Sequence, residues 1–332
     1  IHGWSSIVLG LLLYAVVLTG TVSVLAKEIG YWSASQPVKK VPFADPVNEI
    51  VNKLSKKVGR AYRDDVSIST NIAGNLSIFF HKHIKTSEGF SRDRGVIFEV
   101  NPETGEILNR REGTGLELFK TDQLSALKRF LVDAHVRLYL PSPWGLLVTG
   151  VLGLVMMLAA VTGLFMHRHL LRDIFTLRKR KTSVLEQRDK HSVAASWGLP
   201  FAFLLAFTGC FFSFATSFGI PALAMVAFGG NQAQLVRTVA GAEFTRPGRR
   251  MQTGNIDVMI KDAEARAASV ATSISIEHFG RKNALVTIAS KPTEGSLEGK
   301  TYQYNGLDGS FNRIMPSIGI VPSMGAKIVT II

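Results

Sequence analysis

Five of the eight histidines in this chain of 332 residues lie at the boundaries of long apolar stretches. They are His2, His135, His167, His169 and His191. A neutral imidazole nitrogen is a good ligand for a transition metal, and two imidazoles can bind the opposite faces of a haem iron. Because residues on facing helices meet inside a bundle, this pattern favours b-type haem held between helix ends.

The single cysteine excludes several other kinds of metal centre. Cys210 cannot form a disulfide within the chain, and without a Cys-x-x-Cys-His motif no haem can be attached covalently. One cysteine also cannot hold an iron–sulfur cluster. We therefore expect non-covalent haem b, in one or two copies.

Three stretches without Asp, Glu, Lys or Arg are long enough to cross a bilayer, which takes about 20 helical residues. They run over residues 3–26, 138–166 and 192–236. In the third stretch, Gly219-Ile220-Pro221 predicts a break, so that one span is followed by an interfacial segment. Glycines in and near the spans, such as Gly150, are expected to let helices pack closely.

The loop of residues 167–191 sets the expected orientation in the membrane. It carries eight Lys or Arg against three Asp or Glu, and short loops of this kind stay in the cytoplasm. Residues 27–137 and 237–315 then lie in the periplasm of a bacterium, outside its inner membrane. Because basic inner loops account for the net charge of +13, nucleic acid is not an expected partner.

Both outer segments have the pattern of a small α+β module, in which a periodic helix precedes alternating strands. In the first module a helix begins at Asp45, strands cover 66–70, 76–81 and 96–100, and a second helix runs over 121–134. In the second module the helix covers 255–268 and the strands 273–278, 284–289 and 300–304. Three further histidines lie on these strands, where solvated surface is expected: His81, His83 and His278.

An internal repeat relates the two parts of the chain. His2 precedes Thr19-Gly20 by 17 residues, and His191 precedes Thr208-Gly209 by 17 residues. Likewise, Asn101-x-x-x-Gly105 matches Asn305-x-x-x-Gly309. Equivalent positions in a repeated bundle favour a haem shared by His2 and His191.

The repeat also predicts a partner for His135. That partner falls near position 339, so a fourth span is expected after the last residue given, and a second haem would lie at the opposite face of the membrane. His167 and His169 point about 200° apart on a helix, so at most one faces the bundle, and either could replace His2 or His191 as a ligand.

The sequence therefore predicts an α-helical membrane bundle, with three spans visible and a fourth truncated, that carries two α+β modules. The expected order is transmembrane helix 1 at 1–26, module 1 at 27–137, helix 2 at 138–166, a basic loop at 167–191, helix 3 at 192–219, an interfacial segment with module 2 at 220–316, and the approach to helix 4 at 317–332.

The stretches from His2 to Gly20 and from His191 to Gly209 resemble helices of PepSY-associated transmembrane proteins. Residues 98–108 look like the closing hairpin of a PepSY module. This resemblance covers nearly the whole chain, and the family includes inner-membrane ferric-siderophore reductases with haem between their helices. It implies reduction of a periplasmic ferric chelate by electrons from the cytoplasmic side.

Three functions of different kinds follow from these patterns. The first is electron transfer across the membrane, with a quinol or a flavoprotein as donor, because the chain has no Gly-rich nucleotide motif. The second is an accessory subunit or assembly factor that docks in a larger membrane complex through its PepSY modules. A third role is regulation of peptidases, although the absence of His-Glu-x-x-His argues against the chain being a metalloprotease itself.

Overall fold

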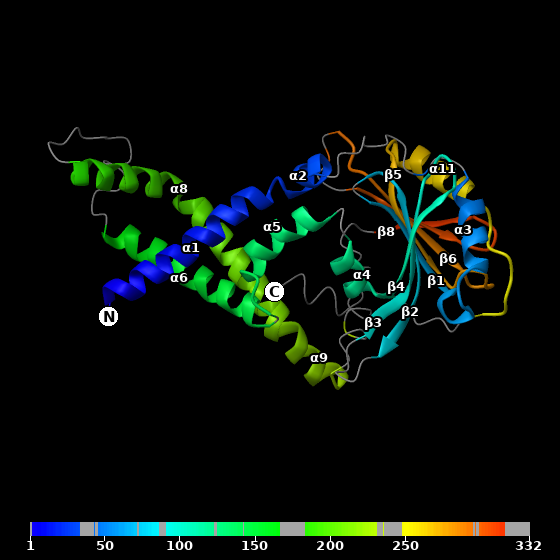
Figure 1. Cartoon of the computed structure of the whole chain (residues 1–332), viewed down its shortest axis with the longest axis horizontal. Helices are drawn as coiled ribbons and strands as arrows, with labels where there is room; N and C mark the ends of the chain where they lie inside the picture. Colours follow the sequence, from blue (N-terminus) through cyan, green and yellow to red (C-terminus); the bar gives the residue numbers. More distant parts are fainter. Residues whose placement is uncertain are drawn as a thin grey trace. The chain divides into compact units, whose positions relative to one another are not determined.

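The computed structural model divides into two compact units (Figure 1). The helix unit contains Ile1–Ala26 and Lys128–Ala222, and the sheet unit contains Lys27–Leu127 and Leu223–Ile332. The structure describes residues 2–33, 43, 46–71, 73–85, 91–122, 125–141, 143–166, 183–230, 235, 248–294, 296 and 299–315. The expected approach to a fourth span, 317–332, and most of the basic loop lie outside these residues.

Long apolar helices make up most of the helix unit, together with the shorter and more polar α5 (Ala126–Arg137). The elements of this unit are α1 (His2–Ser23), most of α5, α6 (Trp144–Met166), α8 (Ser183–Phe214) and the π-helical turn η2 (Ala215–Gly219). Among the described residues, Trp144–Thr162 and Ser196–Phe228 are long and apolar enough to cross a membrane. A third span results if α1 and α2 (Ala26–Ser33), which meet at a bend, form one crossing. The chain is therefore a membrane protein.

The expected break at Gly219-Ile220-Pro221 is wrong, because the chain stays helical there. The turn η2 leads directly into α9 (Ile220–Phe228). A wider π-helical turn before Pro221 relieves the clash that proline makes with the preceding turn of a regular α-helix. At its other end α8 begins at Ser183, inside the stretch expected to be a loop.

Helices α6 and α8 approach closely at two glycines. A Cβ atom on Gly150 would lie 3.0 Å from the Cβ atom of Ser213, and one on Gly153 would lie 3.1 Å from the carbonyl oxygen of Ala206. Any larger side chain at these positions would push the helices apart. Small residues at helix contacts are what the apolar bilayer favours, because packing replaces the hydrophobic effect there.

In the described residues, the sheet unit forms one antiparallel sheet of eight strands, in the order β4-β3-β2-β1-β5-β6-β7-β8. The first half of the sheet unit contains α3 (Val47–Lys56), the short helix η1 (Arg60–Tyr62), β1 (Asp65–Thr70), β2 (Leu76–Lys85), β3 (Ser91–Val100), β4 (Ile107–Thr114) and α4 (Gly115–Thr121). The second half contains α11 (Ile256–Ala267), β5 (Ala271–Glu277), β6 (Leu285–Ser290), β7 (Thr301–Asn305) and β8 (Phe311–Met315).

Both long helices of this unit, α3 and α11, cover the same face of the sheet (Figure 1). Alternate strand residues such as Val66, Ile68 and Ile274 are buried beneath them, while the intervening residues are more exposed. This alternation follows from the two-residue period of a strand. Burying each such side chain contributes roughly 1.5–3 kcal/mol, so the shared core holds both halves together.

The turn that precedes the last strand of each half has the same geometry in both halves. Gly105 and Gly309 adopt φ values of 67° and 76°. The side chain of Asn101 accepts a hydrogen bond from the backbone of Glu103, as the side chain of Asn305 does from Leu307. Each glycine also faces a helix residue in the same position, Ile50 of α3 or Met259 of α11. The repeat detected in the sequence is therefore a repeat of structure.

In the described residues, strand pairing, helix caps and an ion pair between Arg281 and Asp64 at 2.8 Å join the halves. Strands β1 and β5 pair over four residues, with Ile68 opposite Ile274 and Ser67 opposite Ser275. In addition, the two helices cap each other. The Asp257 carboxylate accepts a hydrogen bond from the backbone N–H of Asn48, with oxygen–nitrogen distances of 3.1 and 3.3 Å, and the Asn48 side chain accepts one from the backbone of Ile256.

Several expected boundaries differ from the structure. The two modules form one continuous sheet rather than two separate sheets. The helix expected over 121–134 is α5, which begins later, at Ala126, and most of which belongs to the helix unit although it was assigned to module 1. A separate short helix, α4, precedes it, and Thr114 and Glu117 form a capping box at its N-terminus. The edge strand β8 was not expected, and of β4 only the first two residues fall within the hairpin expected over 98–108.

The reciprocal caps predict that a substitution in one helix loosens the first turn of the other helix. Because Pro46 provides no side-chain cap for α3, Asp257→Ala should raise hydrogen exchange in the first turn of α3 roughly fivefold, which corresponds to a cap worth about 1 kcal/mol. Asn48→Ala should do the same to the first turn of α11. Hydrogen–deuterium exchange of the full chain, read by mass spectrometry, measures both.

The matched control is Asn255→Ala, because the Asn255 side chain accepts from Asp257 within its own helix. This change should loosen α11 alone. If Asp257→Ala also affected only α11, the cross-helix cap would not exist in solution.

Candidate functional site

His135 lies inside the helix unit on α5, against α1. Its Nδ1 atom is 2.9 Å from the backbone carbonyl oxygen of Val16. A second contact holds the same helices together, since the Ser23 hydroxyl donates to the carbonyl of Leu131 at 3.1 Å. Helix α5 therefore lies along the C-terminal half of α1, and the imidazole points at the α1 backbone.

This hydrogen bond fixes the chemical form of the imidazole. A carbonyl oxygen only accepts, so the Nδ1 atom of His135 must carry the hydrogen. In the neutral ring the Nε2 atom is then unprotonated and has a lone pair for a metal. Histidines that bind metals are commonly held by such a bond from their second nitrogen to a backbone carbonyl.

Gly20 makes room for the ring. A Cβ atom at position 20 would lie 2.7 Å from Cε1 of His135, 3.0 Å from Nδ1 and 3.4 Å from Nε2. Any other residue would therefore displace the imidazole from α1. Gly20 belongs to the repeated Thr-Gly pair, and at its equivalent, Gly209 of α8, a Cβ atom would meet nothing within 4 Å.

The connection between α5 and α6 holds His135 in position through an uncommon backbone. Leu138 and Tyr139 both have positive φ, 50° and 59°, where side chains other than glycine cost of order 1 kcal/mol each. Across the connection, the Thr149 hydroxyl of α6 donates to the carbonyl of Val136 at 2.9 Å. The end of α5 is thus tied to both α1 and α6.

The other expected ligands are placed only in part. His2 is the first residue of α1 and His191 lies within α8, but their side chains are outside the described part of the structure. His167 and His169 lie wholly outside the described residues. The pairing of His2 with His191 thus stays a prediction.

An apolar groove of about 610 Å³ separates parts of α6 and α8. It is lined by Ala160, Val161, Leu199, Pro200, Phe203, Leu204 and Phe207. All seven side chains are apolar, so the groove suits a flat hydrophobic group or a lipid chain. His191 precedes the first α8 residue of this lining by eight positions, which is about 12 Å along a helix.

In the sheet unit, His81 is buried, contrary to the solvated surface expected for it. Its Nε2 atom is 3.0 Å from the Ser67 hydroxyl, its Nδ1 atom is 3.9 Å from Asp93, and its ring stacks on Phe79. Sequence reasoning missed this cluster because its members come from three neighbouring strands. A serine, a histidine and an aspartate in this sequence of contacts resemble the catalytic triad of a hydrolase.

The surroundings of Ser67 argue against hydrolysis. Ser67 lies in the middle of the sheet, paired with Phe79 on one side and Ser275 on the other, where backbone N–H groups serve the ladder rather than an oxyanion. Of the other strand histidines, His278 follows β5 with a positive φ of 54°, and the side chain of His83 is outside the described part of the structure.

Within the part of the chain that the structure describes, no three or more His, Cys, Asp or Glu side chains gather where they could hold a metal ion. A haem iron needs only two axial side chains, so this observation does not bear on haem.

Comparison with known proteins identifies the chain at the level of a family. No curated protein matches it. A family model described as the PepSY-associated TM region matches residues 1–290, which is most of the chain and includes α1, α6, α8 and all but the last two strands of the sheet. The chain therefore belongs to the family of proteins with a PepSY-associated transmembrane region.

Proposed function

We propose that this protein binds haem b in its helix unit and moves electrons across the bacterial inner membrane to a periplasmic acceptor, such as a ferric siderophore. The observation that carries the proposal is the Nδ1–carbonyl bond of His135, which leaves Nε2 as the metal-binding atom. Membership of the family and two or three apolar helices support the membrane setting.

The residues around His135 fit a haem ligand. The ring lies where Gly20 has no side chain, and the strained connection at Leu138 and Tyr139 fixes the helix that carries it. Bound haem would supply one-electron transfer. The role of the protein is to hold the imidazole in one tautomer and one orientation, and to keep water away with apolar helices.

A second ligand site is proposed at the other end of the bundle, from His2 and His191, with His167 or His169 as substitutes. Gly150 and Gly153 hold α6 against α8, and the apolar groove between these helices offers room for a planar group. In this arrangement the sheet unit is periplasmic and the basic loop cytoplasmic. A quinol or a flavoprotein would be the donor.

The visible spectrum of the purified protein tests the proposal. We expect the reduced α band of a low-spin b haem. His135→Ala should remove one haem, measured as pyridine haemochrome per chain. His2→Ala and His191→Ala should each remove the same haem, distinct from the one that His135 binds.

His278→Ala is the control, because His278 lies outside the helix unit, and it should keep the full haem content. A folded, colourless protein would refute the proposal and favour the accessory role in a membrane complex. Loss of different haems from His2→Ala and His191→Ala would refute their pairing.

A second test concerns the position of the ring rather than its presence. Gly20→Ala places a methyl group on the imidazole and should break its bond to Val16. Loss of such supporting contacts weakens metal binding about 10–100-fold. The dissociation constant of the His135 haem, measured by haem titration, should therefore rise by about the same factor.

Gly10→Ala and Gly209→Ala are matched changes in α1 and α8, where a Cβ atom meets nothing within 4 Å, and both should bind haem as the unchanged protein does. Equal haem retention by Gly20→Ala would show that His135 is not a ligand in the orientation described.

A further inference from the structure

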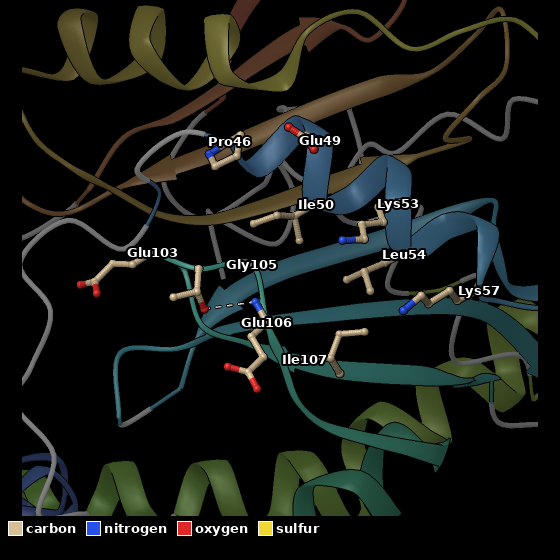
Figure 2. A pocket seen from close by; sticks show the side chains of 11 residues that line it. Pro46, Glu49, Ile50, Lys53, Leu54, Lys57, Glu103, Gly105, Glu106 and Ile107 are labelled. Atoms are coloured by element: carbon tan, nitrogen blue, oxygen red, sulfur yellow. Dashed lines mark hydrogen bonds between the residues drawn. The ribbon is translucent and has the colours of Figure 1, made fainter.

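A pocket of about 290 Å³ lies between α3 and the turn that leads into β4 (Figure 2). Its floor is apolar and formed by Ile50, Leu54 and Ile107. Lys53 of α3 and Lys57, the residue after the helix, also line it. In Figure 2 both lysine side chains point toward the space between helix and turn, whereas the side chains of Glu49 and Glu103 extend away from it.

The corresponding place in the second half of the sheet unit is filled by the protein's own side chains. The matching turns and helix starts put Asp262, Arg266, Tyr304 and Phe311 where the first half has Lys53, Lys57, Val100 and Ile107. The Tyr304 hydroxyl donates to Asp262 at 2.8 Å, and Arg266 donates to the same carboxylate at 2.6 Å.

Aromatic contacts complete this filled site. The Arg266 guanidinium lies 4.1 Å from the centre of the Phe311 ring, and the rings of Tyr304 and Phe311 meet edge to face at 5.7 Å. The hydrogen bond from Arg266 lowers the pKa of the Asp262 carboxyl, and burial raises the pKa of the Tyr304 phenol. At neutral pH an ionised acid is thus held between a phenol and a guanidinium.

Comparing the halves shows what the first half lacks. Val100 and Ile107 are smaller than Tyr304 and Phe311, so the volume of an aromatic ring is missing. Lys57 corresponds to Arg266, but Lys53 stands where the second half has Asp262, so the first half has two cations where the second half has an acid and a base. In the part of the chain that the structure describes, neither lysine has an ion-pair partner, whereas Arg266 does.

We propose that the pocket between α3 and the turn before β4 binds a small aromatic carboxylate from outside. The aromatic ring would lie on Ile50, Leu54 and Ile107, in the volume that Tyr304 and Phe311 occupy in the other half. The carboxylate would pair with Lys53 and Lys57, as Asp262 pairs with Arg266. Glu106 also lines the pocket and is exposed, as Lys53 and Lys57 are, so water screens the charges of all three. This ligand site requires no haem and goes beyond the function proposed above.

Binding of 4-fluorobenzoate to the full chain in detergent, followed by fluorine NMR, tests this inference. Lys53→Gln and Lys57→Gln should each weaken binding about fivefold, the upper range for an exposed ion pair. Lys56→Gln is the matched control, because Lys56 is exposed on the same helix and does not line the pocket. It should leave the affinity unchanged.

A filled variant, Lys53→Asp with Val100→Tyr and Ile107→Phe, copies the second half and should bind no 4-fluorobenzoate. Ile107→Phe alone, which only adds volume at the pocket, provides a second filling variant if the triple change disturbs folding, as judged by hydrogen exchange in α3. Equal binding by a folded filled variant would overturn the proposal. So would equal or tighter binding of 4-fluorobenzylamine or 4-fluorocyclohexanecarboxylate, because the site would then select neither negative charge nor an aromatic ring.

Discussion

The pairing of β1 with β5 is the contact on which the whole sheet unit depends. Four residues of each strand form the ladder, with apolar side chains facing the helices and serines on the opposite face. Without it, two four-stranded sheets would each expose an unpaired central edge. With it, α3 and α11 share one core and come near enough to cap each other through Asn48 and Asp257.

In the helix unit, too, a few contacts determine the position of one element, the helix α5 that carries His135. One carbonyl of α1 orients His135, one glycine admits its ring, and one hydroxyl of α6 holds the end of α5. These contacts come from two different helices, α1 and α6, and together they set the position of α5. The strain at Leu138 and Tyr139 persists because these contacts surround it.

Much of the sheet could be predicted from local patterns. The strands at 66–70 and 76–81 follow the alternation of apolar residues, and the turn at Asn101–Gly105 follows from residues that favour positive φ and local side-chain bonds. By contrast, β4 carries Asn109, Arg110 and Arg111 in succession. An edge strand of this kind has no clear alternation to recognise.

Other features depend on contacts that sequence patterns do not carry. The β1–β5 ladder joins residues about 200 positions apart, and no local signal marks Val66 as a partner of Ile276. The continuous helix at Pro221 depends on a π-helical turn, which has no simple sequence rule. The histidine at 135 was recognisable as a candidate, but its carbonyl partner on α1 follows only from the path of α5.

The ladder between β1 and β5 also suggests an origin for the chain. Ser67 faces Ser275, Ser69 faces Ser273, and the apolar residues face one another in the same way, so each strand meets a near copy of itself. Such a self-complementary interface is that of a two-fold symmetric homodimer. Gene duplication and fusion of a dimeric ancestor would join the subunits permanently. Once joined, the two copies were free to diverge, one closing its helix–turn space with its own side chains and the other leaving it open.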